Sequence, residues 1–235
     1  MTTATLTRAS AQRRDFGALS GVLYVLFFVA SLVIAGALGP SGAVTPYSSD
    51  AEVQAYRLKD PAALEDFLRI LGLFQGLSAL ALLAFVPWLT AFVRRHGGQA
   101  RAGAVRALAT VAGALLLLSA STSWVLAQVG SKAELSTYRA ISDLSFITGA
   151  GPAIAALGLA IFLVAATGRA SRALPVWVAW GGMVVGVASV LSMSSLVTQG
   201  GSVFIPVGRF LGFVWFAVVS VLLYGRAQRA QQANG

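Results

Sequence analysis

Long apolar runs alternate with short polar segments along the whole chain. Six of these runs reach about 18 residues or more, the length that a helix needs to cross roughly 30 Å of hydrocarbon. Residues 79–86 are apolar on every face, whereas the strands of a transmembrane barrel alternate apolar and polar side chains. The pattern therefore predicts an all-α, polytopic membrane helix bundle. Its six transmembrane helices are expected at residues 17–39, 67–93, 104–129, 141–167, 175–197 and 206–224.

The composition supports the same class of protein. With 57% hydrophobic residues, 11% charged residues and a mean hydropathy of +0.79, the 235 residues offer too little polar surface to cover a soluble globule. The gaps after the first one are short, so neighbouring helices should be antiparallel and in contact. We therefore expect residues 1–235 to form a single transmembrane domain whose main partner is the lipid bilayer.

The first gap, residues 40–66, is the only one large enough to hold structure of its own. Ser49 and Glu52 have the spacing of a capping box, in which the two side chains satisfy backbone amides at a helix start. We expect a short external helix at about residues 50–58. Asp60 followed by Pro61 is typical of an N-cap and a first helical position, so the second long helix should begin near Pro61.

Charged residues are distributed unequally between the gaps. If the helices alternate in direction, eleven of the seventeen cationic residues fall on one side: Arg8, Arg13, Arg14, Arg94, Arg95, Arg101, Arg106, Arg169, Arg172, Arg226 and Arg229. The positive-inside rule then places both termini in the cytoplasm. Seven of the eight acidic residues lie at the other side: Asp50, Glu52, Asp60, Glu65, Asp66, Glu134 and Asp143.

The abundance of arginine over lysine is typical of a GC-rich bacterial genome, so we expect a multi-pass protein of the bacterial inner (plasma) membrane. Basic residues that are scattered over short loops facing anionic lipid account for the net charge of +9 without a nucleic-acid partner. The Arg13-Arg14 pair also resembles a twin-arginine export signal. Because a run of about 20 apolar residues and five further helices follow it, we interpret the pair as the cytoplasmic anchor of the first helix.

Polar residues inside the spans are the candidate binding groups, because charge at membrane depth is costly and faces protein or water. They lie in the outer half of the spans, together with serine-rich segments at 119–123 and 189–195. The inner halves, such as residues 214–223, are almost entirely apolar. This arrangement predicts a polar pocket that opens to the outside and is closed below by an apolar plug. The candidate ligand-binding residues are Asp66, Arg69, Gln75, Asp143, Thr148 and Arg209.

A second interpretation of these residues stays open. Serine and threonine side chains can bond to the carbonyl one turn earlier, and long charged side chains near the interface can reach the headgroups. Asp66 and Arg69 are also three residues apart, the spacing of a local ion pair on a helix surface. In this interpretation the polar residues stabilise the helices and bind nothing.

Glycine and proline positions indicate how the helices pack. Glycines four residues apart at 72 and 76, 182 and 186, and 208 and 212 allow close helix approach, either within the bundle or in a homo-oligomer. Pro152 is expected to kink the fourth span, and Pro87 could do the same near the inner end of the second.

Several chemistries are excluded by residue type. There is no cysteine, and the single histidine, His96, lies in a cytoplasmic loop, so a bis-histidine haem and an intramembrane serine-histidine hydrolase have no ligands or base. The carboxylates lack the spacing of a diphosphate-bound Mg²⁺ site, and no nucleotide-binding glycine loop is present. The sequence therefore favours a non-enzymatic protein without metal or cofactor, although Asp66 or Asp143 beside an arginine leaves an enzyme open.

Two hydrophobic motifs are similar to a known family. Residues 21–28 (GVLYVLFF), which open the first helix, and residues 174–182 (LPVWVAWGG), which open the fifth, resemble the bacterial six-helix membrane family called domain of unknown function 4386. The length and the large first external loop also fit that family. The resemblance implies six helices in a single domain and implies no activity or site.

Two classes of function follow. The first is a non-enzymatic membrane protein whose outward-facing pocket binds a small molecule, a lipid or a partner protein through the six candidate residues. The alternative is a small-solute transporter or a permease subunit. Alternating access would require polar or broken helices near the midplane and a route inward, and the apolar inner halves count against such a route. Whether the chain forms a homo-oligomer stays open.

Overall fold

The computed structural model describes residues 17–40, 44–130 and 132–232, and no β-strand occurs within these ranges. The α-helices are α2 (Ser20–Leu38), α3 (Asp50–Lys59), α4 (Pro61–Gly97), α5 (Gln99–Val129), α6 (Leu135–Gly149), α7 (Gly151–Ala170), α8 (Val176–Leu191) and α9 (Phe204–Gln232). Short 3₁₀ helices are η1 (Gly17–Leu19), η2 (Ser192–Leu196) and η3 (Gln199–Val203). The Arg13-Arg14 pair lies outside the described residues.

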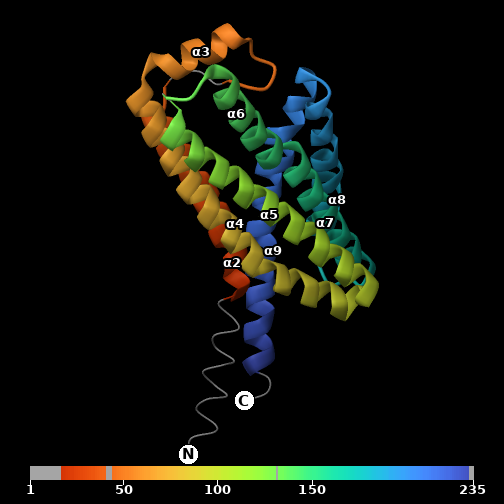
Figure 1. Cartoon of the computed structure of the whole chain (residues 1–235). Coiled ribbons are helices and arrows are strands. Elements are labelled where there is room, and N and C mark those ends of the chain that lie inside the picture. The colour runs from red at the N-terminus through yellow and green to blue at the C-terminus, as the bar shows by residue number, and fades with distance from the viewer. Residues whose placement is uncertain (1–16, 41–43, 131, 233–235) are drawn as a thin grey trace, which may run out of the picture.

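Six helical segments are long and apolar enough to cross a membrane, which confirms the expected number of spans. They are Gly17–Leu38, Pro61–Gly97, Gln99–Val129, Leu135–Ala170, Val176–Leu196 and Gln199–Arg226. The described chain begins at Gly17 and α9 ends at the same end of the bundle, whereas α3 covers the opposite end (Figure 1). We call the end that carries α3 the α3 face.

The segment between the first two spans folds as the sequence predicts. The Ser49 hydroxyl accepts a bond from the Glu52 amide at 3.3 Å, and the Glu52 carboxylate accepts one from the Ser49 amide at 2.7 Å. These bonds form the capping box of α3 and hold the pKa of the Glu52 carboxyl below its usual range. Asp60 caps α4 by accepting from the Ala63 amide at 3.0 Å, and Pro61 occupies the first turn.

The fourth span is broken into two helices, a larger departure than the expected kink. Ala150 has φ −105° and ψ −112°, which no helix continues, and separates α6 from α7. Pro152 has no amide hydrogen to donate to the preceding turn, and its ring clashes with that turn, so the break falls directly before it. Pro87, by contrast, lies on an exposed face within α4, which runs uninterrupted from Pro61 to Gly97.

The helices form a closed ring. Helix α2 packs on α4, α4 on α5, α5 on α6 and α7, α7 on α8, α8 on α9, and α9 returns to α2. Between lipid-facing helices there is little hydrophobic driving force, so close packing and small residues hold the ring together. The tightest crossing joins α7 to α8, where a Cβ atom on Gly158 would lie 2.2 Å from the Ser189 Cβ atom. The paired glycines at 182 and 186 and at 208 and 212 also face neighbouring helices of the same chain.

The main hydrophobic core fills the half of the bundle that lies away from the α3 face. Phe85 of α4, Val164 of α7 and Phe216 of α9 are completely buried there. Ser220 is one of the few polar side chains in this half, and its hydroxyl donates to the Ala18 carbonyl. A smaller cluster under α3 includes Val53, Leu68 and Tyr138. The apolar halves of the spans at that end therefore pack against one another as a hydrophobic core.

Candidate functional site

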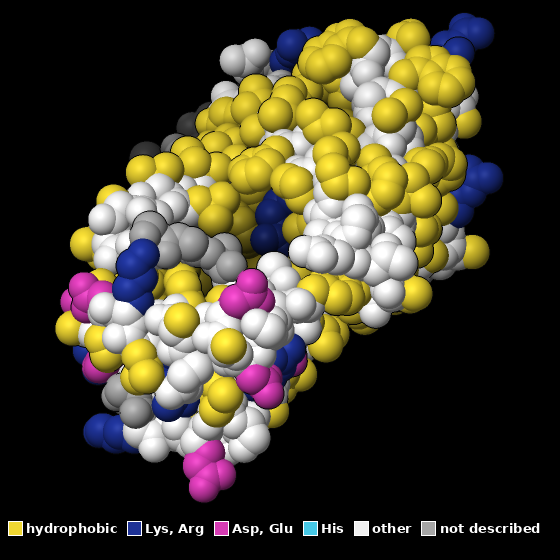
Figure 2. All heavy atoms as spheres, turned by 90° about the horizontal axis from the view of Figure 1, so that it is seen from above, with side chains coloured by type: hydrophobic (Ala, Val, Ile, Leu, Met, Phe, Trp, Pro, Cys, Tyr) yellow, Lys and Arg dark blue, Asp and Glu magenta, His cyan; other side chains and the backbone are white. Residues whose placement is uncertain are grey.

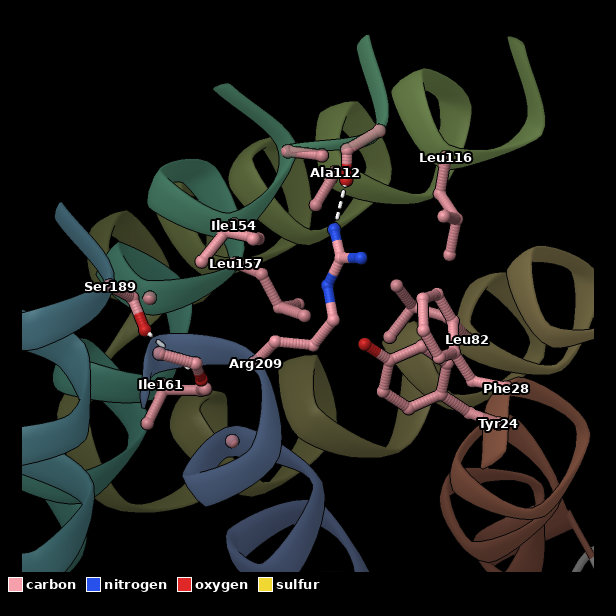
Figure 3. Close-up of a pocket in the computed structure, with 15 residues that line it drawn as sticks. Tyr24, Phe28, Leu82, Ala112, Leu116, Ile154, Leu157, Ile161, Ser189 and Arg209 are labelled. Carbon is pink, nitrogen blue, oxygen red and sulfur yellow. Dashed lines mark hydrogen bonds between the residues drawn. The ribbon is translucent and has the colours of Figure 1, made fainter. Parts of the chain in front are cut away.

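A cavity of about 30 Å³ lies inside the ring, between the α6–α7 break and the main core. Its walls come from α2, α4, α5, α7, α8 and α9 and from the last residue of α6, which makes it the place where the helices of the ring converge (Figure 3). A volume of this size admits one or two water molecules or a small polar group. The lining residues are Tyr24, Phe28, Leu82, Ala112, Leu116, Gly149, Ala153, Ile154, Leu157, Gly158, Ile161, Ser189, Gly208, Arg209 and Gly212.

The α3 face is hollowed above this region. Figure 2 views the molecule from that end and shows a depression between two lobes, with basic side-chain atoms at its bottom, apolar side chains along part of its rim and an acidic side chain near it. Arg209, the charged member of the cavity lining, is half-buried, so part of its side chain remains accessible.

Arg209 projects from α9 toward the broken span. Its guanidinium donates to the Gly149 carbonyl and lies over the Phe28 ring, 4.8 Å from the ring centroid. Gly149 is the last residue of α6, and its carbonyl has lost the amide partner that a continuous helix would provide. A cation at a helix C-terminus also interacts favourably with the helix dipole. Arg209 therefore has a structural role: it caps α6 at the break.

The charge of Arg209 is not balanced by an acid. The ion pairs among the described residues are Arg69 with Glu65, Arg139 with Asp50 and Arg139 with Asp143, and none involves Arg209. The remaining walls of the cavity are apolar or carry neutral polar groups. Isolated charge in a low-dielectric environment is costly, so this arrangement is unusual for a purely structural residue.

Tyr24 of α2 is the second polar group that faces the cavity. Its ring is held by edge-on contacts with Phe213 and Phe216, each with a centroid distance of 5.4 Å. The side chain is 4% exposed, and its hydroxyl points toward the Arg209 side chain (Figure 3). Within the described part of the chain, no residue forms a hydrogen bond with this hydroxyl.

The Ser189 hydroxyl, the other polar side chain of the lining, is already engaged. It donates to the Val185 carbonyl at 2.8 Å within α8. The cavity therefore presents one guanidinium and one phenol, and neither is a strong base or an activated nucleophile. Such a pair can bind and orient a polar group. No group of three or more histidine, aspartate or glutamate side chains that could hold a metal ion lies among the residues the structure describes.

The structure separates the six residues that the sequence selected. Arg209 lines the cavity. Thr148 precedes the Arg209 acceptor Gly149, but its hydroxyl bonds to the Leu144 carbonyl of its own helix at 2.7 Å. Gln75 is buried in α4 and is not part of the cavity lining. Only Arg209 thus contributes a side chain to the cavity.

Asp143 belongs to a cluster at the α3 face. Its carboxylate lies 3.8 Å from the Arg139 guanidinium. Arg139 also pairs with Asp50 and donates to the carbonyls of Pro46 and Ser48 at 3.1 and 2.8 Å. These contacts tie the segment before α3 to α6, which is a structural arrangement.

Asp66 and Arg69 lie exposed on α4, away from the cavity. Arg69 pairs with Glu65 one turn earlier and not with Asp66, so the expected local ion pair exists with a different acid. Arg69 also borders a separate groove of about 620 Å³ between α4 and α5 that is lined mainly by apolar side chains.

The serine-rich segments serve helix contacts. Ser121 and Thr122 bond to carbonyls of α5 itself, as the second interpretation of the sequence expected. Ser119 and Ser123 bond to Ser145 of α6, with oxygen separations of 2.7 Å to the Ser145 carbonyl and 3.0 Å to its hydroxyl, respectively. These bonds connect the two helices close to the break.

Tyr24 and Phe28 were not among the residues that the sequence predicts at the site. The available signal was a tyrosine in the middle of an otherwise apolar span, since a buried phenol needs a polar partner. Comparisons with protein-family models, with curated proteins and with solved structures found no match to this chain. The resemblance to the family of domain of unknown function 4386 therefore stays a prediction.

Proposed function

We propose that this chain is a non-enzymatic, multi-pass protein of the bacterial inner membrane that binds a small molecule or lipid group in the cavity beside Arg209. The observation that carries the proposal is a half-buried cation that has no acidic partner among the described residues and lines a mainly apolar cavity. Natural bundles retain charge at membrane depth mainly where it faces a ligand, water or a partner.

The charge distribution supports entry of the ligand from outside the cell. The end of the bundle opposite the α3 face carries Arg94, Arg95, Arg101, Arg106, Arg169, Arg172, Arg226 and Arg229. Most acidic residues lie at the α3 face instead. By the positive-inside rule the α3 face, and with it the depression, is external.

The test is native mass spectrometry of the protein purified in mild detergent. We expect a bound small molecule or lipid in the wild type and at least a tenfold lower occupancy in Arg209→Gln, because a hydrogen bond from a charged donor contributes about 1.5–3 kcal/mol. Asp143→Asn is the matched control, since that carboxylate lies outside the cavity. Equal occupancy in all three proteins would remove the support for a ligand site at Arg209.

One observation favours the alternative, a small-solute transporter. The break between α6 and α7 is the kind of discontinuous helix that transporters place at their substrate site. Against it, Phe85, Val164 and Phe216 are completely buried in the hydrophobic core between the cavity and the opposite end of the bundle. The binding protein is therefore the better-supported proposal.

A further inference from the structure

We infer that the cavity beside Arg209 binds a small monovalent anionic group, with a carboxylate as the best fit, between the Arg209 guanidinium and the Tyr24 hydroxyl. This inference rests on the proposed function, because it names the ligand class of the same site. The group can belong to a free short carboxylic acid or to the head of a fatty acid from the bilayer.

The charge of the cavity lining favours an anionic ligand. The cavity lining contains one cationic side chain and no acid, and the other walls are mostly aliphatic or aromatic. A cationic ligand would be repelled, and a neutral ligand would leave the guanidinium uncompensated in a low-dielectric site. A monovalent anion neutralises the site, whereas a divalent anion would leave an excess negative charge in the same apolar surroundings.

The free hydrogen-bond donors of the cavity favour a carboxylate. A guanidinium has five N–H groups, and the bond to the Gly149 carbonyl engages only one side of it. The Tyr24 hydroxyl points toward Arg209 from the facing helix and has no hydrogen-bond partner among the described residues (Figure 3). Two donors that approach from α9 and α2 match the two oxygens of a carboxylate, which accepts strongly from charged and hydroxyl donors.

The rigid side chains and the small volume of the cavity favour a compact anionic group. Tyr24 is fixed between Phe213 and Phe216, and Arg209 is fixed by Gly149 and Phe28, so both donors are oriented before a ligand arrives. The cavity volume of about 30 Å³ fits a carboxylate head and not a bulky anion. The rest of a longer ligand has to extend into the depression at the α3 face.

The experiment is a thermal-unfolding titration of the purified full chain, followed by tryptophan fluorescence. Sodium acetate and sodium butyrate are compared with acetamide and butyramide, which have the same shape without the charge, and with sodium sulfate at equal sodium concentration. We expect a saturable rise in Tm with the two carboxylates and none with the amides or sulfate. An equal response to carboxylates and amides would overturn the inference.

Three variants locate the effect. Tyr24→Phe leaves the α6 cap intact and should raise the apparent Kd for acetate about tenfold, the effect of one hydrogen bond to a charged group. Arg209→Gln should abolish the response. If that variant does not fold because α6 loses its cap, Arg209→Lys keeps the charge but loses the fork of donors, and it should bind acetate more weakly than the wild type does. Unchanged acetate binding in Tyr24→Phe would overturn the inference.

A second arm distinguishes the two sources of the carboxylate. If the ligand is a fatty acid, oleic acid should raise the Tm in nanodiscs and methyl oleate should not. If the ligand is a free acid, acetate should raise the Tm and oleic acid should not. If neither form of carboxylate binds but native mass spectrometry still finds a neutral species that Arg209→Gln loses, the anion inference fails and the proposed ligand site stands. If both measurements find nothing, both fail.

Discussion

Ser145 joins α6 to α5 through its hydroxyl, which donates to the Ser119 carbonyl at 3.1 Å and lies 3.0 Å from the Ser123 hydroxyl. We expect Ser145→Ala to lower the free energy of unfolding by about 1 kcal/mol, the usual size of interhelical hydrogen bonds in membranes. The measurement is a denaturant titration of the protein in mixed micelles.

Ser121→Ala is the matched control for this effect. Ser121 lies two residues from Ser123 on the exposed side of α5 and bonds only to the Leu117 carbonyl of its own helix, at 2.9 Å. That local bond contributes little to helix association, so the variant should unfold like the wild type. Equal destabilisation by the two substitutions would mean that the bonds between α5 and α6 carry no special weight.

Single residues also mark the limit of what the sequence revealed about the site. Arg209 was identifiable, because a charge inside an apolar run is costly wherever the helix is placed. The sequence marks Tyr24 as a phenol within an apolar span, but its partner was not predictable, because Arg209 lies on a helix at the other end of the chain. Asp143 was selected for its depth, yet Arg139 on the same helix engages it in a surface cluster.

Several helix boundaries could be predicted from local sequence signals. Helix α3 and the start of α4 were predictable, since the capping box and the Asp60-Pro61 pair are local signals. The complete break at Ala150 was not predictable, because a proline at position 152 can either kink a helix or end it. The choice depends on partners for the freed carbonyls, and Arg209 of α9 supplies one of them.

The contact between α7 and α8 gives a prediction at the scale of elements. A methyl group on Gly158 would lie 2.2 Å from the Ser189 Cβ atom and 3.0 Å from the Gly186 carbonyl oxygen. Because both neighbours are rigid, Gly158→Ala should force the helices apart and lower the free energy of unfolding by about 1–3 kcal/mol. The same micellar denaturant titration measures this change.

Gly181→Ala provides a control of opposite sign. Gly181 lies within α8, and apart from its own stretch of helix no described atom lies within 4 Å of the position its Cβ would occupy. Alanine in a helix is favoured over glycine by about 0.5–1 kcal/mol, so this variant should be slightly more stable than the wild type. If both alanine variants were stabilised, the close crossing of α7 and α8 would not be required by the fold.

At the scale of the whole molecule, the acidic residues and the depression both lie toward the α3 face. The number of spans and the dry core were predictable from hydropathy, because the bilayer imposes length and apolarity on every crossing helix. The position of the cavity was not, because it depends on how six helices close into a ring around one broken span. The orientation of that ring in the membrane decides on which side of the membrane the α3 face lies.

The natural sequence contains no cysteine, so single-cysteine variants report position without background labelling. Ala51→Cys lies exposed on α3, and Gln99→Cys lies exposed at the start of α5 at the opposite end. In spheroplasts of a bacterial host, a membrane-impermeant maleimide should label Ala51→Cys at once and Gln99→Cys only after the membrane is opened. The reverse pattern would place the α3 face, and the depression in it, in the cytoplasm.

The same reagent separates a binding protein from a transporter. Ser220→Cys lies in the packed core and replaces one small side chain by another of similar size. For a binding protein we expect no labelling of Ser220→Cys from either side, because the core stays closed. Alternating access would open the core periodically, so reaction of Ser220→Cys from the opposite side in intact, folded protein would favour transport over binding.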